Sequence, residues 1–540
     1  MNRWLCLLLA SMTCLPGVVV AQQNPKNIDD IQIVFEKSKE IILPIEEKPQ
    51  TNRLQSLRQD TVRRDFSAVS TGLAKPTNVL DLKPRVLNYA APSDEGLRPN
   101  YLKLGLGNYL TTHLEGFYSH GSKDDYIAAK VLHLNSALGS ERWMASGVNQ
   151  LHTFGTYKAL GGRLSADLVV ENNRNTLYAF IPSSAEKGDI RISNLRTGFR
   201  AAYQTEKANK YKLDLGLAAN AITSFADQRS YFAQLSGNYS LSLGDAGVLG
   251  LSSNLAINKI SSQVSRNVAF LDVGGSLTRT FGGLTLKPSL TVLAENDSID
   301  KKNVHLYPGL DASFALSEAT TLFGGVNSGY SQNLFFNQAK VNPWLGNISQ
   351  FSYTNMPLAI GVGVRVAKTK YQMEVSGGLK QFKNYLLWAP IRNDSARMMA
   401  LNLRDTAVTL TYLQISANYR FNDLISAETG LQIQAANSSF RTEIPNVPLL
   451  TWRLAPTFGQ GGFSVSPALV VMSSYDLLTP RLTTVKSGIV ADLSLKASYV
   501  ISKRLDVNLD LYNLANNKPY LFYGYRQRGI MAVFGATLKF

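Results

Sequence analysis

Apolar and polar residues alternate along the chain from about Asn100 to the last residue. In the stretch 505–512, Leu and Val occupy the odd positions, and Asp, Asn and Tyr occupy the even ones. The same alternation recurs at 211–220, 371–380 and 413–422. A period of two is typical of a strand with one apolar and one polar face. The pattern therefore predicts an all-β protein.

The lengths of the connections between these strands also alternate. Short turns separate them at positions such as 161–163, 244–247 and 502–504. Longer loops fall between the turns, at 173–188, 331–356, 385–407, 438–449, 475–484 and 514–523. Counting strands back from the C-terminus places all the long loops on one rim, which is typical of transmembrane barrels. A soluble sandwich also alternates, but it uses far fewer strands.

We therefore predict that residues 100–540 form an antiparallel outer-membrane β-barrel of about 22 strands, with 18 as the lower bound. Inside hydrocarbon every backbone N–H and C=O needs a partner, so strands can span a bilayer only as a closed barrel. Aromatic residues near predicted strand ends are expected to form the interfacial girdles. They are Tyr499, Tyr512, Tyr520, Phe522, Tyr523 and Tyr525.

The first 21 residues have the features of a signal peptide. Arg3 is followed by the apolar stretch Trp4–Leu9, and Val19-Val20-Ala21 fits a small-residue cleavage pattern. Cys6 and Cys14 lie inside this segment, so the mature chain is expected to contain no cysteine. Residues 22–99 lack the alternation and contain several prolines. We expect them to form an N-terminal segment that is periplasmic or occludes the lumen.

The last predicted strand carries a candidate assembly signal. Ile530, Ala532, Phe534, Ala536, Leu538 and Phe540 share one face. This strand resembles the terminal strand that the barrel assembly machinery of Gram-negative bacteria recognises. The resemblance assigns the signal to Phe534, Leu538 and Phe540, and it implies the assembly machinery as a partner and the outer membrane as the location.

A wider resemblance covers the last sixty or so residues. The alternating strand and loop Leu505–Asn517, the Tyr-rich loop Pro519–Tyr525 and the strand Gly529–Phe540 look like the final hairpin of TonB-dependent receptors. The resemblance implies a 22-stranded barrel that acts in transport. Those receptors carry a long plug domain before the barrel, and residues 22–99 are too short and irregular to match it.

The chain therefore resembles the plug-less, TonB-receptor-like barrels of Bacteroidota, and residues 33–44 are similar to the N-terminal stretch of that group. Asp29–Val34 has the form of a TonB box, a short strand that pairs with an energising protein. An ordinary extended linker would show the same short alternation of polar and apolar residues.

No motif for catalysis, a metal or a cofactor stands out. The chain has no Gly-x-Ser-x-Gly elbow. Its five histidines, His113, His120, His133, His152 and His305, form no metal-binding spacing. Glu295, Asp297 and Asp300 make an oxygen-rich loop, but Lys301 and Lys302 follow, so we expect a solvated loop rather than a calcium site. We predict that the protein is not an enzyme and has no cofactor.

The net charge of +16 does not indicate nucleic-acid binding, since export and scattered basic residues argue against it. Outer-membrane lipids, including the phosphates of lipopolysaccharide, are the expected partners. Basic side chains predicted to face the lumen would favour anions, and predicted inward carboxylates oppose them. The basic ones are Lys212, Lys380, Arg420, Lys496 and Lys539, and the acidic ones are Asp214, Glu374, Glu428, Asp492, Asp506 and Asp510.

Three functions follow from these observations. The first is a channel or transport component whose selectivity is set by the loops 331–356 and 385–407. The second is a structural barrel that anchors a multi-protein assembly with outer-membrane lipoproteins or other barrels. For that role, the apolar stretch Leu334–Trp344 would form a partner interface, although it would equally suit a loop folded into the lumen. An outer-membrane hydrolase ranks third.

Overall fold

The computed structural model describes residues 100–540, apart from 123–124, 142–143, 180–189, 206–210, 224–228, 262–264, 298–302, 348–352, 392–393, 404–405, 423 and 440–442. The predicted signal peptide, the segment 22–99 and the TonB-box-like stretch Asp29–Val34 lie outside the described residues.

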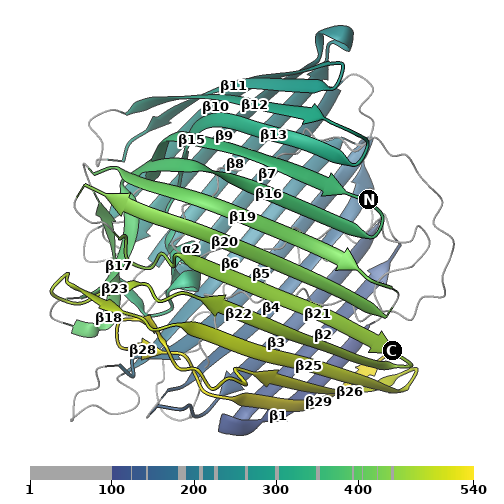
Figure 1. Ribbon diagram of the computed structural model, residues 1–540, viewed down its shortest axis with the longest axis vertical. Helices are drawn as coiled ribbons and strands as arrows, with labels where there is room; N and C mark the ends of the chain where they lie inside the picture. The colour runs from purple at the N-terminus through teal and green to yellow at the C-terminus, as the bar shows by residue number, and fades with distance from the viewer. Residues whose placement is uncertain are drawn as a thin grey trace. The chain divides into compact units, whose positions relative to one another are not determined.

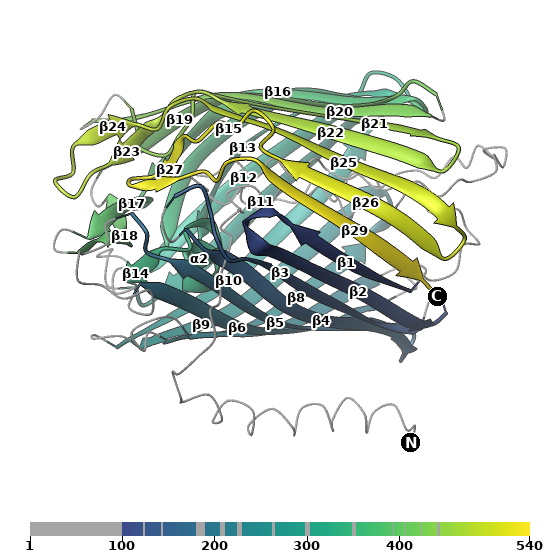
Figure 2. The ribbon, with the colours of Figure 1, turned by 90° about the horizontal axis from the view of Figure 1, so that it is seen from below.

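Among the described residues, 22 strands form one antiparallel sheet (Figures 1 and 2). They are β1 (Tyr101–Gly107), β2 (Thr111–Gly121), β3 (Tyr126–Ser136), β4 (Ser146–Ala159), β5 (Gly162–Thr176), β6 (Arg191–Thr205), β7 (Tyr211–Thr223), β8 (Arg229–Ser242), β9 (Val248–Ser261), β10 (Arg266–Phe281), β11 (Leu284–Glu295), β12 (Val304–Ala315), β13 (Thr320–Ser331), β15 (Thr354–Ala367), β16 (Tyr371–Lys383), β19 (Val408–Arg420), β20 (Ile425–Ser438), β21 (Leu450–Gln460), β22 (Phe463–Met472), β25 (Val490–Ser502), β26 (Leu505–Tyr512) and β29 (Met531–Lys539).

The sheet closes on itself between its first and last strands. β1 pairs with β2 on one side and with β29 on the other, from Tyr101 opposite Lys539 to Gly107 opposite Val533. The predicted closed antiparallel barrel of 22 strands is therefore confirmed. Phe540 donates its backbone N–H to the carbonyl of Asn100 at 2.9 Å, so the described chain enters and leaves the barrel at the same end.

The predicted two faces of each strand are confirmed. On β29, Phe534 and Leu538 are exposed on the outside, with 64% and 48% of their surface accessible, while the alternating Val533 and Thr537 are buried. Large apolar side chains such as Leu104, Leu306 and Val362 likewise lie exposed on other strands. In water such a surface would be unfavourable, whereas a bilayer stabilises it.

The girdle interpretation is correct for only part of the aromatic set. Tyr499 is exposed on the outside of β25. Tyr512, in contrast, packs against Met531 inside the barrel, and Phe522 and Tyr525 are buried among the loops. Strand-end position alone did not separate aromatics that meet lipid from aromatics that fill the interior.

The long connections all join strands at one end of the barrel, as predicted, and the short turns lie at the other end. Following the usual arrangement in such barrels, we call the long-loop end the outer mouth. The long loops contain α2 (Phe335–Val341), β14 (Leu345–Asn347), β17 (Tyr385–Ile391), β18 (Asp394–Leu403), β23 (Asp476–Leu478), β24 (Thr484–Lys486), β27 (Tyr520–Phe522) and β28 (Tyr525–Arg526). Within the described residues, no helix has the length and apolar character needed to cross a bilayer.

Candidate functional site in the barrel interior

The inward face of strands β8 to β12 changes character along its length. On β9, Ser252 and Asn254 line the half nearer the short turns, whereas Ala256 and Ile260 line the half nearer the outer mouth. Ile260 is 1% exposed. Other apolar residues buried on this wall are Ile192, Ile222, Phe232, Val268, Phe270, Leu293 and Tyr307. A wall of this kind requires a cover, because the lumen would otherwise bring water against it.

The loop between β13 and β15 supplies part of that cover. Phe335 of α2, Trp344 and Leu345 are each no more than 1% exposed and pack into the same apolar cluster as the wall. The Trp344 indole N–H donates a 3.0 Å hydrogen bond to the carbonyl of Thr176 at the end of β5. The stretch Leu334–Trp344 is therefore folded into the lumen, and its interpretation as a partner interface is wrong.

The hairpin β17–β18 lies at the centre of the mouth, with β17 buried on both faces. Tyr385 and Leu387 pack in a cluster with Met356 and Val408 at the outer ends of β15 and β19. Trp388 belongs instead to the cluster that contains Trp344 and the wall. This explains the continuous apolar run YLLWAPI, since a strand covered on both sides has no polar face.

The last two long loops complete this assembly. The Trp344 and Tyr525 rings stack at 3.9 Å, and Phe522 contacts both Trp344 and Trp388. The Tyr475 hydroxyl donates to the carbonyl of Leu521 at 3.3 Å, which joins the loops that contain β23 and β27. We call residues 332–353, 384–407, 473–489 and 513–530 the loop layer. Its apolar clusters reach from the wall at β6–β12 to the wall at β15–β20.

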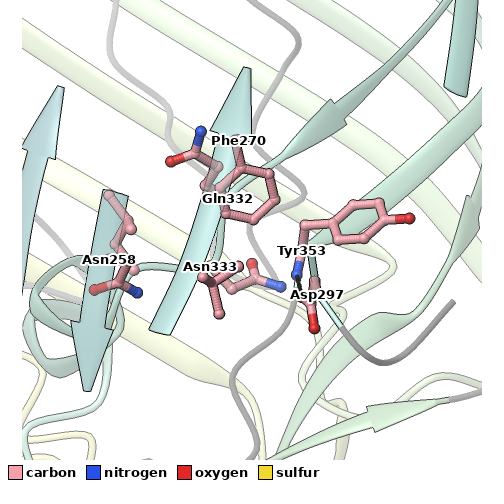
Figure 3. A pocket seen from close by; sticks show the side chains of 8 residues that line it. Asn258, Phe270, Asp297, Gln332, Asn333 and Tyr353 are labelled. Carbon is pink, nitrogen blue, oxygen red and sulfur yellow. Dashed lines mark hydrogen bonds between the residues drawn. The ribbon is translucent and has the colours of Figure 1, made fainter. Parts of the chain in front are cut away.

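The loop layer is closely packed against the wall. A cavity beneath it measures about 10 Å³, which is room for one water molecule. Figure 3 shows Asn258 and Phe270 of the wall around this cavity, together with Gln332, Asn333 and Tyr353 of the loop. Burial also raises the pKa of the Tyr178 and Tyr475 hydroxyls in the loops above its usual range, which further favours their neutral form.

A buried ionic network holds one edge of the layer. The Asp297 and Glu295 side chains are fully buried, and Asp297 forms an ion pair with Arg266 of β10. Asp297 also accepts the backbone N–H of Tyr353 at 3.2 Å, and His305 lies 3.3 Å from a Glu295 oxygen and 3.1 Å from the Tyr353 hydroxyl. The expectation of a solvated loop here is wrong for Glu295 and Asp297. No local sequence pattern pointed to Arg266, which begins β10, or to Tyr353, which directly precedes β15, because both are distant from Asp297 along the chain.

The other half of the lumen is lined by small and charged side chains. Several inward charges form ion pairs within one strand, between neighbouring strands or, for Lys103 of β1 and Asp510 of β26, across the intervening strand β29. The pairs are Lys103–Asp510 at 2.7 Å, Lys539–Asp506 at 2.9 Å, Lys130–Glu115 at 3.4 Å, Lys212–Asp214 at 3.3 Å and Arg365–Glu374 at 2.7 Å. Two of the lysines expected to attract anions, Lys212 and Lys539, are thus paired with carboxylates. The predicted anion bias is weakened at these two positions.

The histidines do not gather at one place. His113 faces the lumen beside Glu115 at 3.7 Å, whereas His133 is near Thr112 and Asn149 at the outer end of β3. His305 belongs to the buried network. Within the described part of the chain, no group of three or more acidic, His or Cys side chains is placed to hold a metal ion.

This architecture was compared with known protein families, curated proteins and solved structures. No known family model and no curated protein matches the chain by sequence. Solved structures match it well. The ferric-catecholate import receptor Fiu from Escherichia coli K12 has a TM-score of 0.60 at 8% identity, covering 82% of each chain. The FrpB iron transporter from Neisseria meningitidis has 0.62 at 11% identity, covering 83% of this chain and 81% of its own. The copper transporter OprC has 0.58 at 13% identity, covering 82% and 80%.

The barrel has the fold of the TonB-dependent receptors. The match extends over nearly the whole described chain, whereas the sequence resemblance reached only the last hairpin. At these identities the likeness concerns the fold. The assignment to a plug-less group of Bacteroidota stays a prediction, and so does the assembly signal at Phe534, Leu538 and Phe540.

Proposed function

We propose that the protein is a solute-transport component of the Gram-negative outer membrane whose lumen is closed at the outer mouth by its own loops. The receptor-type barrel with its apolar outer surface supports the location. Structural neighbours described as an import receptor, an iron transporter and a copper transporter favour transport over catalysis.

The loop layer is the observation that carries the proposal. Its central aromatic residues, Trp344, Trp388 and Tyr525, are each at most 2% exposed. Burial of one large apolar side chain contributes about 1.5–3 kcal/mol, so the layer is stable in the resting state. Transport requires this layer to move, and a solute or partner can move it only by binding the open arrangement more tightly than the closed one.

Removal of the central hairpin tests the proposal. Residues 386–402, most of β17–β18, are replaced by a short Gly-Ser linker, and the purified barrel is inserted into planar bilayers. We expect the unaltered protein to show little conductance and the deletion variant to form an open channel. The matched control shortens the turn 480–483 between β23 and β24, where Leu482 is half exposed, and this variant should stay closed. Equal conductance in all three proteins would contradict closure by the loop layer.

The segment 22–99 enters this proposal as a second element. The described chain begins with Asn100 at the short-turn end, which is periplasmic in barrels of this kind. We propose that the segment 22–99, which precedes Asn100 in the sequence, controls access from that side. Deletion of 22–99 alone should leave conductance low, because the loop layer remains. Deletion of both elements should give a larger conductance than deletion of the hairpin alone, and an open channel after removal of 22–99 alone would contradict the role of the loops.

A further inference from the structure

The inner wall contains a second, larger recess, in the half of the lumen that the loop layer does not fill. Its volume is about 240 Å³, against about 10 Å³ for the cavity under the loops. It lies on β3 to β6, toward the short-turn end. The residues around it are Tyr126, His152, Phe154, Gly155, Thr156, Ser165, Ala166, Asp167 and Arg200.

The strand register explains the composition of this recess. Ala128, Phe154, Asp167 and Arg200 stand directly opposite one another on four neighbouring strands. They share one face, and the alternating residues on the other face, such as Leu151 and Leu164, are exposed on the outside. An aromatic ring, a carboxylate and a guanidinium therefore follow one another along a line that faces the lumen. Small neighbours, Ala128 among them, leave space beside the line.

The aromatic part is built as a wall of rings. The Phe154 ring meets the Tyr126 ring edge to face at 6.2 Å, and the His152 ring lies over Phe154 at 4.8 Å. Such a wall stacks well against a planar or apolar group of a ligand, which gains about 0.5–1.5 kcal/mol beyond the area buried.

Among the described residues, Asp167 and Arg200 form no ion pair and no side-chain hydrogen bond, although residues so opposed lie about 5 Å apart at their Cβ atoms. The His152 ring of the same recess interacts electrostatically with Asp167. Elsewhere on the inner wall, opposite charges on neighbouring strands form ion pairs, as Lys130 does with Glu115 and Arg365 with Glu374. An open carboxylate beside an open guanidinium is the arrangement that two opposite charges on one ligand would satisfy.

We propose that this recess binds a zwitterionic solute with an aromatic side chain, that is, an aromatic amino acid. The guanidinium of Arg200 would receive the α-carboxylate through paired N–H donors. The carboxylate of Asp167 would accept the α-ammonium, and the ligand ring would lie against Tyr126 and Phe154. A simple anion fits less well, because Asp167 would repel it. The site requires only that the lumen be reached from the short-turn end, so it stands whether or not the loop layer opens.

The test measures binding of three probes by calorimetry to the full chain in lipid nanodiscs. Phenylalanine carries both charges, 3-phenylpropionate only the carboxylate, and 2-phenylethylamine only the ammonium. We expect phenylalanine to bind most tightly. Arg200→Gln should weaken phenylalanine and phenylpropionate by about tenfold or more, and Asp167→Asn should do the same for phenylalanine and phenylethylamine, since a hydrogen bond to a charged group is lost in each case.

The control variant is Lys212→Gln, which removes another half-exposed lumen cation outside the recess and should leave all three affinities unchanged. The exchange of both charges, Asp167→Arg with Arg200→Asp, should restore phenylalanine binding to within about tenfold, because both partners are present again in reversed order. Absence of saturable phenylalanine binding, both to the unaltered protein and to a variant without residues 22–99, would overturn the proposal. Equal effects of R200Q and K212Q would overturn it as well.

Discussion

The two halves of the lumen are built on the same strands but have opposite interiors. Toward the outer mouth, most inward residues of β8 to β12 are apolar, such as Phe232, Ile260 and Phe270, and the loop layer covers them. Toward the short turns, the inward residues of the same strands are mostly small or polar, and no described loop covers them. The difference shows that the inward face of a barrel is not uniformly polar. A change of polarity along that face marks the depth to which the loops fill the interior.

The largest effect is expected from the centre of the filled half. Trp388→Ala should cost about 3–5 kcal/mol of loop-layer stability, because it leaves a cavity between buried surfaces. The measurement is protease cleavage in the loop 384–407, which should rise steeply. Phe323→Ala is the matched change in the other half, where the ring is only partly buried beside Arg365. It should leave cleavage nearly unchanged, and equal cleavage of the two variants would remove the distinction between the halves.

A smaller loss is expected at the buried edge. Arg266→Gln leaves the fully buried Asp297 carboxylate without its cationic partner, which should cost about 3 kcal/mol. The double variant Arg266→Gln with Asp297→Asn removes the charge from the other partner too and should recover part of the loss. Protection of Tyr353 and its neighbours in amide hydrogen exchange reports this effect. If the double variant is no better than the single one, the edge is not held by the ionic contact.

A pair of changes on one strand sharpens the comparison further. Ile260→Thr places a hydroxyl in the apolar half of β9 and should cost about 2 kcal/mol, because burial is lost and the hydroxyl lacks a partner. Ser252→Val makes the opposite change in the polar half and should cost less than about 0.5 kcal/mol, since that site is not buried. Urea unfolding in detergent compares them. If both variants lost a similar free energy of unfolding, the position of a residue along the lumen would not determine how well the barrel tolerates its substitution.

The smallest effect is expected outside the lumen. Lys486 donates to Glu443 at 2.6 Å on the exposed loop surface, and this contact lowers the pKa of Glu443 and raises that of Lys486. The stabilisation is present between their ordinary values of 4.5 and 10.5, and it is lost when Glu443 is protonated at lower pH or Lys486 is deprotonated at higher pH. Lys486→Met should change stability by about 0.5 kcal/mol or less in thermal unfolding at pH 7, and the difference should shrink as the pH falls below 4.5 and Glu443 becomes protonated.

The fold was more accessible from the sequence than the interior. Alternation and loop lengths predicted the strands, their number and the rim of each loop, because these depend on local periodicity. The stretch Leu334–Trp344 was compatible with a partner interface or with a loop in the lumen. The apolar residues of a loop indicate that it is buried, but they do not indicate which surface buries it. Glu295 and Asp297 were misassigned because their burial depends on Arg266 and Tyr353, which are distant in sequence. The recess went unseen because strand register, not spacing, brings Phe154, Asp167 and Arg200 into line.

The double-sided burial of β17 has a consequence for how this surface can change. Outer loops of membrane barrels usually accept insertions and substitutions freely, since only water surrounds them. Here, the residues between Tyr385 and Ile391 are part of a protein core, so variation that evades antibodies or phages is confined to exposed positions such as Leu482 and Val485. An epitope tag for surface labelling therefore belongs in the β23–β24 turn, and the longest loops of the protein are the wrong place for it.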